Sequence, residues 1–579
     1  MKNSRSPDSA PENLRTRKRP EITLPDRALV GLLRNCNKKG ANIMEKNTVN
    51  QTAGTMVSGG ENLYPNLPHP PVMEAEKRLP YEQFAKPGLI SKIAPASLLY
   101  AIFFTFCLYK NASGITYPFY VAGTIGFAVY TIRKFGISWK GEHISILAAS
   151  LLLGISNCFT DNSKIILMNE AWLFVLMMYF LLAVCFDTEK WQIGKFVGNM
   201  AGLVLKSIGK MFSFFLDAQA WQKEHKGAKK SQTLYVLAGA AISVPLIAVV
   251  LLLLSTADVI FRESLDMIFG DINGWDVFCC IILSVFMFFF SYGMVSLLEG
   301  RELNDTVKDH RTGQPVIAIS ATAVIALIYV YFCGIQIVYL FAGYGTLPEG
   351  YSYAYYARQG FFQLLFICLM NLGLVLIGLG FFRESKALKG ILLVISFCTF
   401  IMIASSAYRM LLYISVYYLT FLRIFVLWAL VVIALLMAGV VGKTLYNTFP
   451  LFRYGLAVVT CCYLILSFGR PDYWIARYNI SSYMTQTKEQ EEEGVRLDTW
   501  YLSGLSADAA PVIMSKNNIE QYYEYEAQKE KMLKGEIKSI DTPEWQVSYI
   551  LLKEGRVNNM SFRSYNFSRG YVKKALEKK

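Results

Sequence analysis

Charged residues are scarce in this chain of 579 residues, and their scarcity argues against an ordinary soluble protein. Asp, Glu, Lys and Arg make up 17% of the sequence and hydrophobic residues 54%, whereas soluble domains carry about a quarter charged residues. Apolar runs of about 20 residues, long enough to cross a hydrocarbon core about 30 Å thick, recur through the middle of the chain. The sequence therefore predicts an all-α integral membrane protein that resides in the lipid bilayer.

Catalytic and metal-binding signatures are also missing. The chain has only four histidines, none near another in sequence, and 11 cysteines, most of them inside apolar runs where a thiol acts as a small hydrophobe. The adjacent pairs Cys279-Cys280 and Cys461-Cys462 lack the CxxC spacing of a redox or metal site. No Ser-His-Asp set, HExxH motif or pair of carboxylates is recognisable. We therefore expect no enzymatic activity, no cofactor and no metal.

The chain has a formal net charge of +14, and its basic residues lie in the two tails and in alternate loops. This distribution indicates the orientation of a membrane protein rather than nucleic-acid binding. About eleven spans are predicted, near 92–109, 114–132, 143–160, 165–186, 234–256, 275–298, 315–343, 359–382, 390–407, 422–441 and 454–468. One set of loops carries nineteen Lys or Arg residues, and the loops that alternate with it carry five. The basic set consists of the loops at 133–142, 187–233, 299–314, 383–389 and 442–453. The positive-inside rule makes these loops cytoplasmic, with the N-terminus inside and the C-terminus outside the plasma membrane.

Three regions follow from this pattern. Residues 1–90, rich in Pro, Asn, Lys and Arg, are predicted to form a disordered basic tail in the cytoplasm. Residues 91–468 form the multi-pass transmembrane domain. Residues 469–579 are expected to form a small α-helical extracytoplasmic domain, because stretches such as DTPEWQVSYILLKEG begin with N-capping residues and continue with helical spacing. This domain is the expected contact for other envelope proteins.

The loop near 191–217 has the pattern of an amphipathic helix. Apolar residues alternate with a polar set that recurs at helical spacings, namely Lys195, Asn199, Lys206, Lys210, Ser213 and Asp217. Such a helix is expected to lie flat on the inner leaflet with its lysines toward the head groups. It serves either as an interfacial connector or as a lipid-sensing regulatory element.

Two arginines, Arg409 and Arg423, stand inside an apolar region from Ala387 to Val441. As one helix, this region of about 55 residues would be about 80 Å long, far more than one bilayer crossing. We therefore expect a break at SSAYR (405–409), with residues 408–422 lying at the outer surface. Arginine and tyrosine at that depth are ordinary interfacial anchors.

A second interpretation groups these arginines with other charges of the outer face. The candidate cluster consists of Asp258, Arg262, Arg358, Arg409 and Arg423. An ionisable residue at membrane depth is costly unless it is paired, so Asp258 and one arginine form either a structural ion pair or a ligand site. The candidate polar residues deeper in the bundle are Gln336, Gln363 and Asn371.

Four stretches together resemble a known family: SSAYRMLLYISVYYLTFLR, YYARQGFFQLL, LSTADVIF and YWIARYNI…DTWYLSGLSADAAPVIM. They are similar to bacterial membrane proteins catalogued as domains of unknown function 4153 and 4173, over roughly residues 90 to 579. The resemblance implies a bacterial multi-pass membrane protein with no established activity. Where that family usually has Tyr-Gly-Leu-Thr, this chain has Tyr417-Tyr418-Leu419-Thr420, so the bulkier Tyr418 is expected to alter the local turn.

Three functional hypotheses remain. The first is a non-enzymatic envelope protein that senses or scaffolds through its outer domain and its inner amphipathic helix. The second is a transporter or lipid-handling protein that uses the cluster of Asp258 and the arginines, which requires a polar cavity reaching the membrane midplane. The third, a membrane-embedded enzyme, requires a concentrated set of acids and bases that the sequence does not provide.

Overall fold

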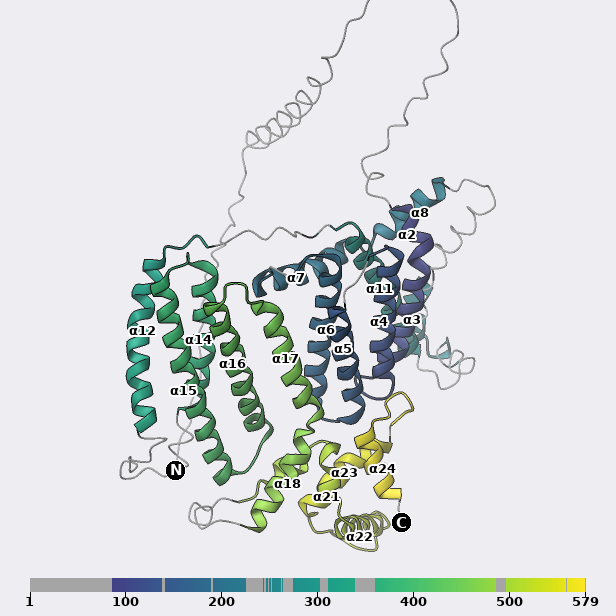
Figure 1. Cartoon of the computed structure of the whole chain (residues 1–579). Coiled ribbons are helices and arrows are strands. Elements are labelled where there is room, and N and C mark those ends of the chain that lie inside the picture. The colour runs from purple at the N-terminus through teal and green to yellow at the C-terminus, as the bar shows by residue number, and fades with distance from the viewer. Residues whose placement is uncertain are drawn as a thin grey trace, which may run out of the picture. The chain divides into compact units, whose positions relative to one another are not determined.

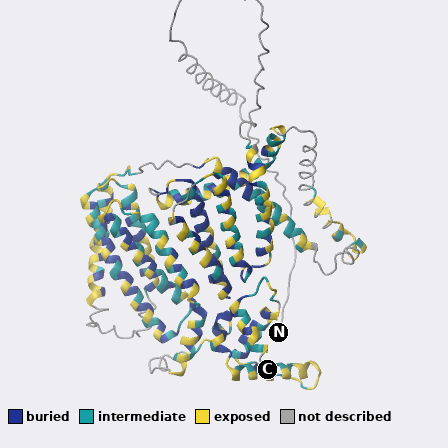
Figure 2. Ribbon diagram, turned by 45° about the vertical axis from the view of Figure 1, so that its right-hand side comes forward, coloured by how far each residue is buried: buried dark blue, intermediate teal, exposed yellow. Residues whose placement is uncertain are grey.

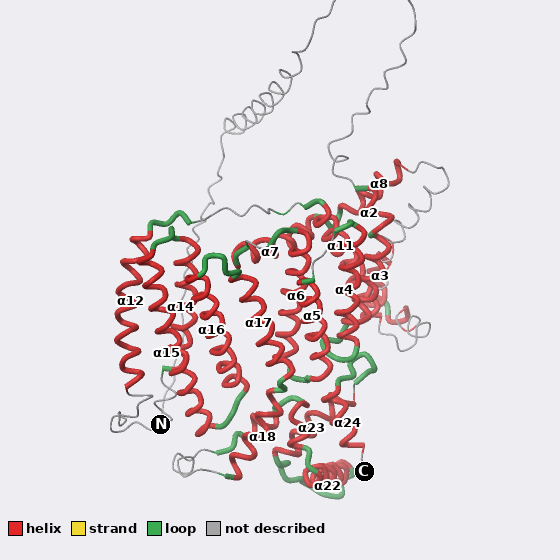
Figure 3. Tube along the Cα trace, viewed as in Figure 1, coloured by secondary structure: helices red, strands yellow, loops and turns green. Residues whose placement is uncertain are grey.

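The computed structural model describes the chain from residue 86 to 577, apart from several internal stretches. The residues outside the description in that interval are 138–140, 189–190, 225–242, 244–245, 248, 251–252, 262, 264–273, 302, 304–310, 339–359, 486–495 and 559. Residues 1–85 of the predicted N-terminal tail and most of the fifth predicted span therefore lie outside the described residues. The predicted disorder is wrong for residues 87–90, which begin the short helix α2 (Pro87–Lys92). Within the described residues, the regular structure is helical and no strand is present (Figure 3).

Seven helices in the described part of the chain are long and apolar enough to cross a membrane. They are α6 (Ser163–Cys185), α11 (Gly274–Glu299), α12 (Pro315–Gln336), α14 (Phe361–Phe381), α15 (Lys386–Tyr417), α16 (Phe421–Leu445) and α17 (Leu451–Phe468). Three further helices overlap predicted spans: α3 (Ala94–Leu108), α4 (Thr116–Lys134) and α5 (Glu142–Phe159). An all-helical, multi-pass membrane protein is thus confirmed.

The helices of the bundle pack side by side in two groups (Figure 1). One group contains α12, α14, α15 and α16, and the other contains α3 to α6 and α11, with α17 packed against both α16 and α5. Buried residues lie along the inward sides of these helices, and exposed residues lie along the outside (Figure 2). Large apolar side chains such as Leu327 and Ile465 face outward, as expected of surfaces that contact lipid.

The expected break at SSAYR is wrong. Helix α15 continues through this stretch for 32 residues and ends at Tyr417, which makes it about 48 Å long. The serines do not interrupt the helix because neighbouring helices satisfy them: Ser405 Oγ donates to Gln336 Oε1 at 2.6 Å. Figure 1 shows α15 extending past α12 toward the C-terminal helices. The chain turns only at residues 418–420, between α15 and α16.

The predicted amphipathic segment forms two helices, α7 (Ile193–Gly209) and α8 (Ser213–Glu224), and not one. The assignment of its polar face is wrong at two positions, because Asn199 and Asp217 are buried. Asp217 accepts hydrogen bonds from the Tyr292 hydroxyl of α11 at 2.7 Å and from the backbone N–H of Lys86 at 2.6 Å. A helix that packs against both protein and membrane has two kinds of buried face, and the sequence pattern does not separate them.

In the described residues of the C-terminal region, the regular structure is helical. Its helices are α18 (Pro471–Met484), α20 (Thr499–Ser503), the short 3₁₀ helix η3 (Ala507–Ala509), α21 (Ala510–Ile513), α22 (Lys516–Leu533), α23 (Trp545–Asn558) and α24 (Phe567–Glu577). Their apolar core is continuous with the bundle, since Leu502, Ile550 and Val572 belong to the same cluster of buried residues as Leu153 and Leu466. We call these helices the C-terminal helices below.

Candidate functional site at the junction with the C-terminal helices

Polar and charged side chains are buried where the C-terminal helices meet the bundle. This junction is formed by the turn between α5 and α6 (160–162), by η3 with its N-cap Ser506, and by the start of α24 (566–569). Asn162 shapes the turn, because its side chain accepts from the backbone N–H groups of Lys164 and Ile165 and so caps α6. The capped turn presents its remaining polar groups to the C-terminal helices.

Asp508 is the centre of the junction. Its residue is fully buried, and its carboxylate accepts from the Thr160 hydroxyl at 2.6 Å and from the backbone N–H of Asp161 at 2.9 Å. Burial raises the pKa of Asp508, while these hydrogen bonds act in the opposite direction. Because Asp508 belongs to η3, one side chain joins the C-terminal helices to the turn that follows α5.

Asp161 makes the reciprocal contact. Its residue is 2% exposed, and its carboxylate accepts from Arg569 Nε at 2.6 Å and from the backbone N–H of Ala507 at 3.2 Å. The guanidinium of Arg556 lies 3.7 Å away. A buried carboxylate requires such partners, since an unpaired buried charge is strongly destabilising. The turn thus donates to the C-terminal helices and accepts from them.

Asn566 and Ser568 complete the junction at the start of α24. The Asn566 amide donates to the carbonyl oxygens of Asn157 at 3.1 Å and Thr160 at 2.8 Å, and its oxygen accepts from the Ser568 N–H at 2.9 Å. The Ser568 hydroxyl donates to the Phe159 carbonyl at 2.7 Å. Because these carbonyls end α5, Asn566 both caps α24 and satisfies the end of a bundle helix.

The turn between α15 and α16 is held by the C-terminal helices in a similar way. Asn479 of α18 accepts from the Leu419 N–H at 2.7 Å and donates to its carbonyl at 2.9 Å. The Tyr501 hydroxyl accepts from the Phe421 N–H at 2.9 Å. Tyr418 has a φ of 64°, in a region of backbone conformation that favours glycine. The family resemblance leads one to expect glycine at this position, and the backbone conformation is one that suits glycine.

Arg409 lies deeper and level with the ends of two bundle helices. It is 7% exposed, and its Nη2 donates to Gln336 Oε1 at 3.2 Å, at the last residue of α12. Its other terminal nitrogen lies beside Gly360, which precedes α14. Arg409 is therefore packed among helices, and not on a separate surface segment as predicted.

Arg423 lies in the first turn of α16 and is half-buried. Its Nη1 donates to the backbone carbonyls of Tyr417 and Tyr418, and its guanidinium lies 4.3 Å from the ring centroid of Tyr413. A cation at the C-terminal end of a helix satisfies its last carbonyls and favours the helix dipole. The described contacts of Arg423 thus stabilise the end of α15.

The remaining members of the predicted charge cluster are not brought together by a described contact. Asp258 is exposed, and its carboxylate accepts from the backbone N–H of Ile260 at 2.8 Å. Arg262 and Arg358 lie outside the described residues. The pairing of Asp258 with an arginine stays a prediction.

Two of the three predicted intramembrane polar residues lie inside the bundle. Asn371 is fully buried, accepts from the Tyr329 hydroxyl at 2.8 Å and donates to Thr399 Oγ1 at 3.0 Å. Gln336 is buried against Arg409, as described above. Gln363, in contrast, is exposed on α14.

A further buried polar group joins α5, α6 and α17, and the sequence analysis did not select it. Asn169 donates to Asn157 Oδ1 at 2.6 Å and accepts from the hydroxyls of Tyr463 at 2.6 Å and Ser467 at 2.7 Å. Polar groups within the hydrocarbon region must find partners inside the protein, and these residues satisfy one another.

A family model covers more than half of the chain. The model described as Domain of unknown function (DUF4153) matches residues 147–515. The chain belongs to this family. No curated protein and no solved structure matches the chain.

The DUF4153 region contains both sides of the central contact of the junction. It begins within α5 and ends just before α22, so it includes Asp161 and Asp508. The partners from α23 and α24, Arg556, Asn566 and Arg569, lie beyond it. The contact between turn and η3 is thus internal to the DUF4153 region, while the cations that neutralise Asp161 come from the segment after it.

The sequence offered one signal for these junction residues. In SADAAPV, Asp508 stands between alanines and close to further apolar residues, an uncommon setting for a surface carboxylate. Asp161 and Asn566 have no comparable signal, because each stands in a short polar stretch.

The junction holds two parts of the chain together through paired groups. Each carboxylate oxygen of Asp161 and Asp508 accepts at least one hydrogen bond across the junction. No group of three or more His, Cys, Asp or Glu side chains that could hold a metal ion occurs among the described residues. Because all four carboxylate oxygens of Asp161 and Asp508 are paired, the junction forms a buried attachment.

Proposed function

We propose that this DUF4153 protein is a non-enzymatic envelope protein that senses or scaffolds through its C-terminal helices. In this proposal it lies in the bacterial cytoplasmic membrane with about eleven spans, its N-terminus in the cytoplasm and its C-terminal helices outside. The observation that carries the proposal is the buried attachment through Asp161 and Asp508. Such an attachment fixes the C-terminal helices relative to the bundle and makes them a rigid platform.

The surface of the C-terminal helices supports a role in binding other envelope proteins. It carries large apolar side chains that are well exposed, among them Trp500 at 84% and Met484 at 78%. Aromatic residues are enriched at the centres of protein interfaces, where their large area contributes most of the binding energy. A rigid platform with such anchors is suited to holding a partner in a fixed place.

Photo-crosslinking in intact cells tests this proposal. A photoreactive amino acid in place of Trp500 is expected to form a discrete adduct with an envelope protein. Lys516, whose side chain is 94% exposed on the same set of helices, is the matched control position. In an Asp508→Ala background the adduct should weaken while the chain remains in the membrane. Identical adducts from both positions, or an adduct unaffected by Asp508→Ala, would contradict the proposal.

The proposed orientation has its own test. In intact cells, a cysteine in place of Lys573 should react with a membrane-impermeant thiol reagent, and a cysteine in place of Lys206 should react only after lysis. The parent chain, with its own cysteines, gives the background. The reverse pattern would place the C-terminal helices in the cytoplasm.

A transporter or lipid-handling function is the second candidate, in which the outer-face charges bind a ligand. The buried contact between Arg409 and Gln336 favours it, because a buried ionisable group in a membrane protein is a candidate for ligand binding. This function requires water-accessible positions along α12 and α14 as far as the membrane midplane. If cysteines placed along these helices are labelled only at their ends, this candidate fails. A ligand retained by the purified protein in native mass spectrometry would favour it over the first.

A further inference from the structure

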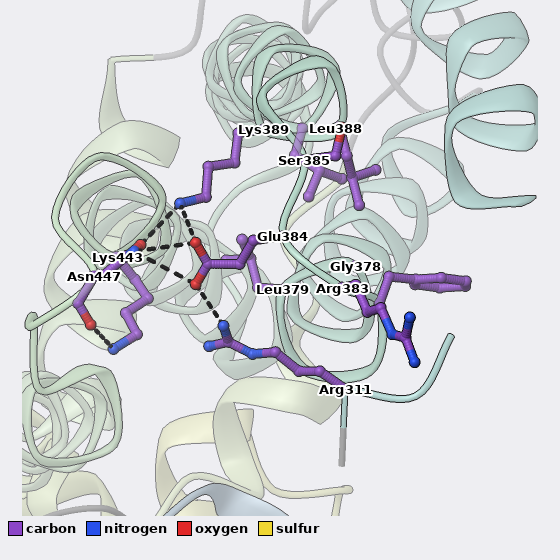
Figure 4. A pocket seen from close by; sticks show the side chains of 12 residues that line it. Arg311, Gly378, Leu379, Arg383, Glu384, Ser385, Leu388, Lys389, Lys443 and Asn447 are labelled. Atoms are coloured by element: carbon purple, nitrogen blue, oxygen red, sulfur yellow. Dashed lines mark hydrogen bonds and ion pairs between the residues drawn. The ribbon is translucent and has the colours of Figure 1, made fainter. Parts of the chain in front are cut away.

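A basic pocket (Figure 4) is lined by residues at the end of α14 and the start of α15. In Figure 1 these helix ends lie on the side of the bundle away from the C-terminal helices. The pocket is formed where α14 ends, where α15 begins and where α16 ends, with Arg311 contributed by the segment before α12. Its lining residues are Arg311, Gly378, Leu379, Phe382, Arg383, Glu384, Ser385, Leu388, Lys389, Leu392, Lys443 and Asn447. None of these residues belongs to the junction described above.

Cations outnumber anions in this pocket by four to one. Glu384 is the one carboxylate of the lining, and it is shared between Arg311, at 2.5 Å, and Lys389, at 3.2 Å. These two neighbours hold the pKa of Glu384 below its usual range, so it remains charged. The four cations less this carboxylate give the pocket a net charge of +3. One internal anion therefore leaves most of the positive charge uncompensated.

Two of the cations, Lys443 and Arg383, are directed away from Glu384. Lys443 Nζ donates to the backbone carbonyls of Asn447 at 2.5 Å and Phe449 at 3.1 Å, which are neutral acceptors. The guanidinium of Arg383 extends away from Glu384 in Figure 4, and the residue is exposed. Both charges can thus accept an external anion without losing a carboxylate partner.

The backbone around the pocket adds to its affinity for anions. Helix α15 begins there with Ser385 as its N-cap, and neither a side-chain cap nor an acidic residue in the first turn opposes the positive end of the helix dipole. A pair of backbone hydrogen bonds, from Gly313 to Phe381 at 3.1 Å and from Arg383 to Gly313 at 3.0 Å, fixes the segment that carries Arg311. The pocket is therefore built by three helices and a pinned loop.

Beside its polar groups, the lining has four large apolar side chains that continue into the bundle. Leu379 and Phe382 come from the last turn of α14 and its end, and Leu388 and Leu392 from the first turns of α15. Cationic groups above apolar side chains, at the end of membrane-spanning helices, match a molecule with an anionic head and an apolar tail. A soluble phosphate compound has no apolar part to contact these apolar side chains.

We propose that this pocket binds the phosphate of an anionic phospholipid from the surrounding leaflet. The head-group phosphate lies against Lys443, Arg383 and the start of α15, and the acyl chains lie along α14 and α15. Glu384 keeps Arg311 and Lys389 in place and limits the total charge of the empty pocket. The cations account for recognition of a phosphate group, and the apolar lining indicates that this phosphate belongs to a lipid.

The experiment uses the full chain, purified in a mild detergent and titrated with phosphatidylglycerol, phosphatidylcholine or inorganic phosphate. Native mass spectrometry counts the retained lipid, and thermal unfolding reports stabilisation. We expect retention of phosphatidylglycerol over phosphatidylcholine. The variant Arg383→Gln/Lys443→Gln should lose affinity for phosphatidylglycerol by about tenfold or more, since charge-assisted hydrogen bonds to phosphate are the strong ones. Glu384→Gln, which removes the competing carboxylate, should retain the lipid more tightly.

A matched control removes the same charge from the same end of the bundle. Lys195→Gln/Lys206→Gln on α7 should leave selective retention of phosphatidylglycerol unchanged. Equal losses in the two double variants, or equal retention of the two lipids, would overturn the proposal, because both results indicate general attraction between a basic surface and an anionic lipid. Stabilisation by inorganic phosphate alone, at equal phosphate concentration, would refute the lipid as the source. The opposite expected effects of Glu384→Gln and of Arg383→Gln/Lys443→Gln distinguish binding from a general loss of folding.

Discussion

Lys553 of α23 makes folding of the C-terminal helices dependent on pH. The residue is 4% exposed, and its Nζ lies 5.1 Å from the ring centroid of Tyr549. Burial, with a smaller contribution from the nearby Arg556, lowers the pKa of Lys553 from 10.5 to about 8, although Asp161 and Asp472 act in the opposite direction. A tenfold change in proton affinity corresponds to about 1.4 kcal/mol, so the charged ammonium opposes folding by about 3 kcal/mol at pH 7.

The direction of the effect follows from proton binding. Between pH 8 and 10.5 the unfolded chain holds this proton and the folded chain has released it, so the stability of the folded state rises with pH. From pH 7 to pH 9.5 the gain amounts to about 2 kcal/mol. Above pH 10 the buried Tyr549, whose pKa is raised by burial, gives the opposite trend, because the unfolded chain then ionises its tyrosine. The useful window therefore ends below pH 10.

Thermal unfolding in detergent, followed by circular dichroism from pH 7 to pH 9.5, measures this effect. The melting temperature of the unmodified chain should rise by several degrees relative to that of Lys553→Met, which has no proton to lose at this position. Lys573→Met is the matched control, since its side chain is 53% exposed on the neighbouring α24, and it should follow the unmodified chain. If Lys553→Met keeps the full rise, the ammonium is not held in the low-dielectric setting described here.

Other predictions concern the junction and the buried arginine. Asp508→Ala should lower the free energy of unfolding by about 2–4 kcal/mol, because two buried donors lose their acceptor, and Thr160→Val in the same chain should recover part of this loss. Tyr418→Phe should raise stability by about 1 kcal/mol in chemical denaturation, because the tyrosine hydroxyl is buried without a hydrogen-bond partner among the described residues; a loss would disprove this. Arg409→Gln should lose about 1–3 kcal/mol, by the same measurement. Asp258→Asn should change stability by less than about 0.5 kcal/mol, and a larger loss that disappears in the double variant with Arg409→Gln would instead establish their pairing.

The membrane helices could be predicted from the sequence because a bilayer sets their length and composition. The predicted span 165–186 corresponds to α6, at 163–185, and the span 422–441 lies within α16, at 421–445. The end of α15 could not be predicted, because the serines of SSAYR are polar in sequence but satisfied in space. Their acceptors, Gln336 and the carbonyl of Phe361, come from other helices.

The contacts of the junction could not be predicted from the sequence for a related reason. Thr160 and Asp508 are 348 positions apart, and neither residue type in its local setting signals that the other is near. Asn479 and Asn566 each begin an Asn-X-Ser sequence that fits a glycosylation site, yet both side chains are buried and bonded to backbone groups. Tertiary hydrogen bonds leave no periodic pattern, whereas apolar faces and spans do.

Helix α15 is one continuous helix that connects two features described above. At about 48 Å it is longer than the hydrocarbon core, and it contains no break at which the strain of a displacement could be absorbed. One end carries Lys389 of the basic pocket, and the other leads into Leu419, which is clamped by Asn479 of the C-terminal helices. The pocket and the turn held by Asn479, described above as separate features, therefore lie at the two ends of one unbroken helix.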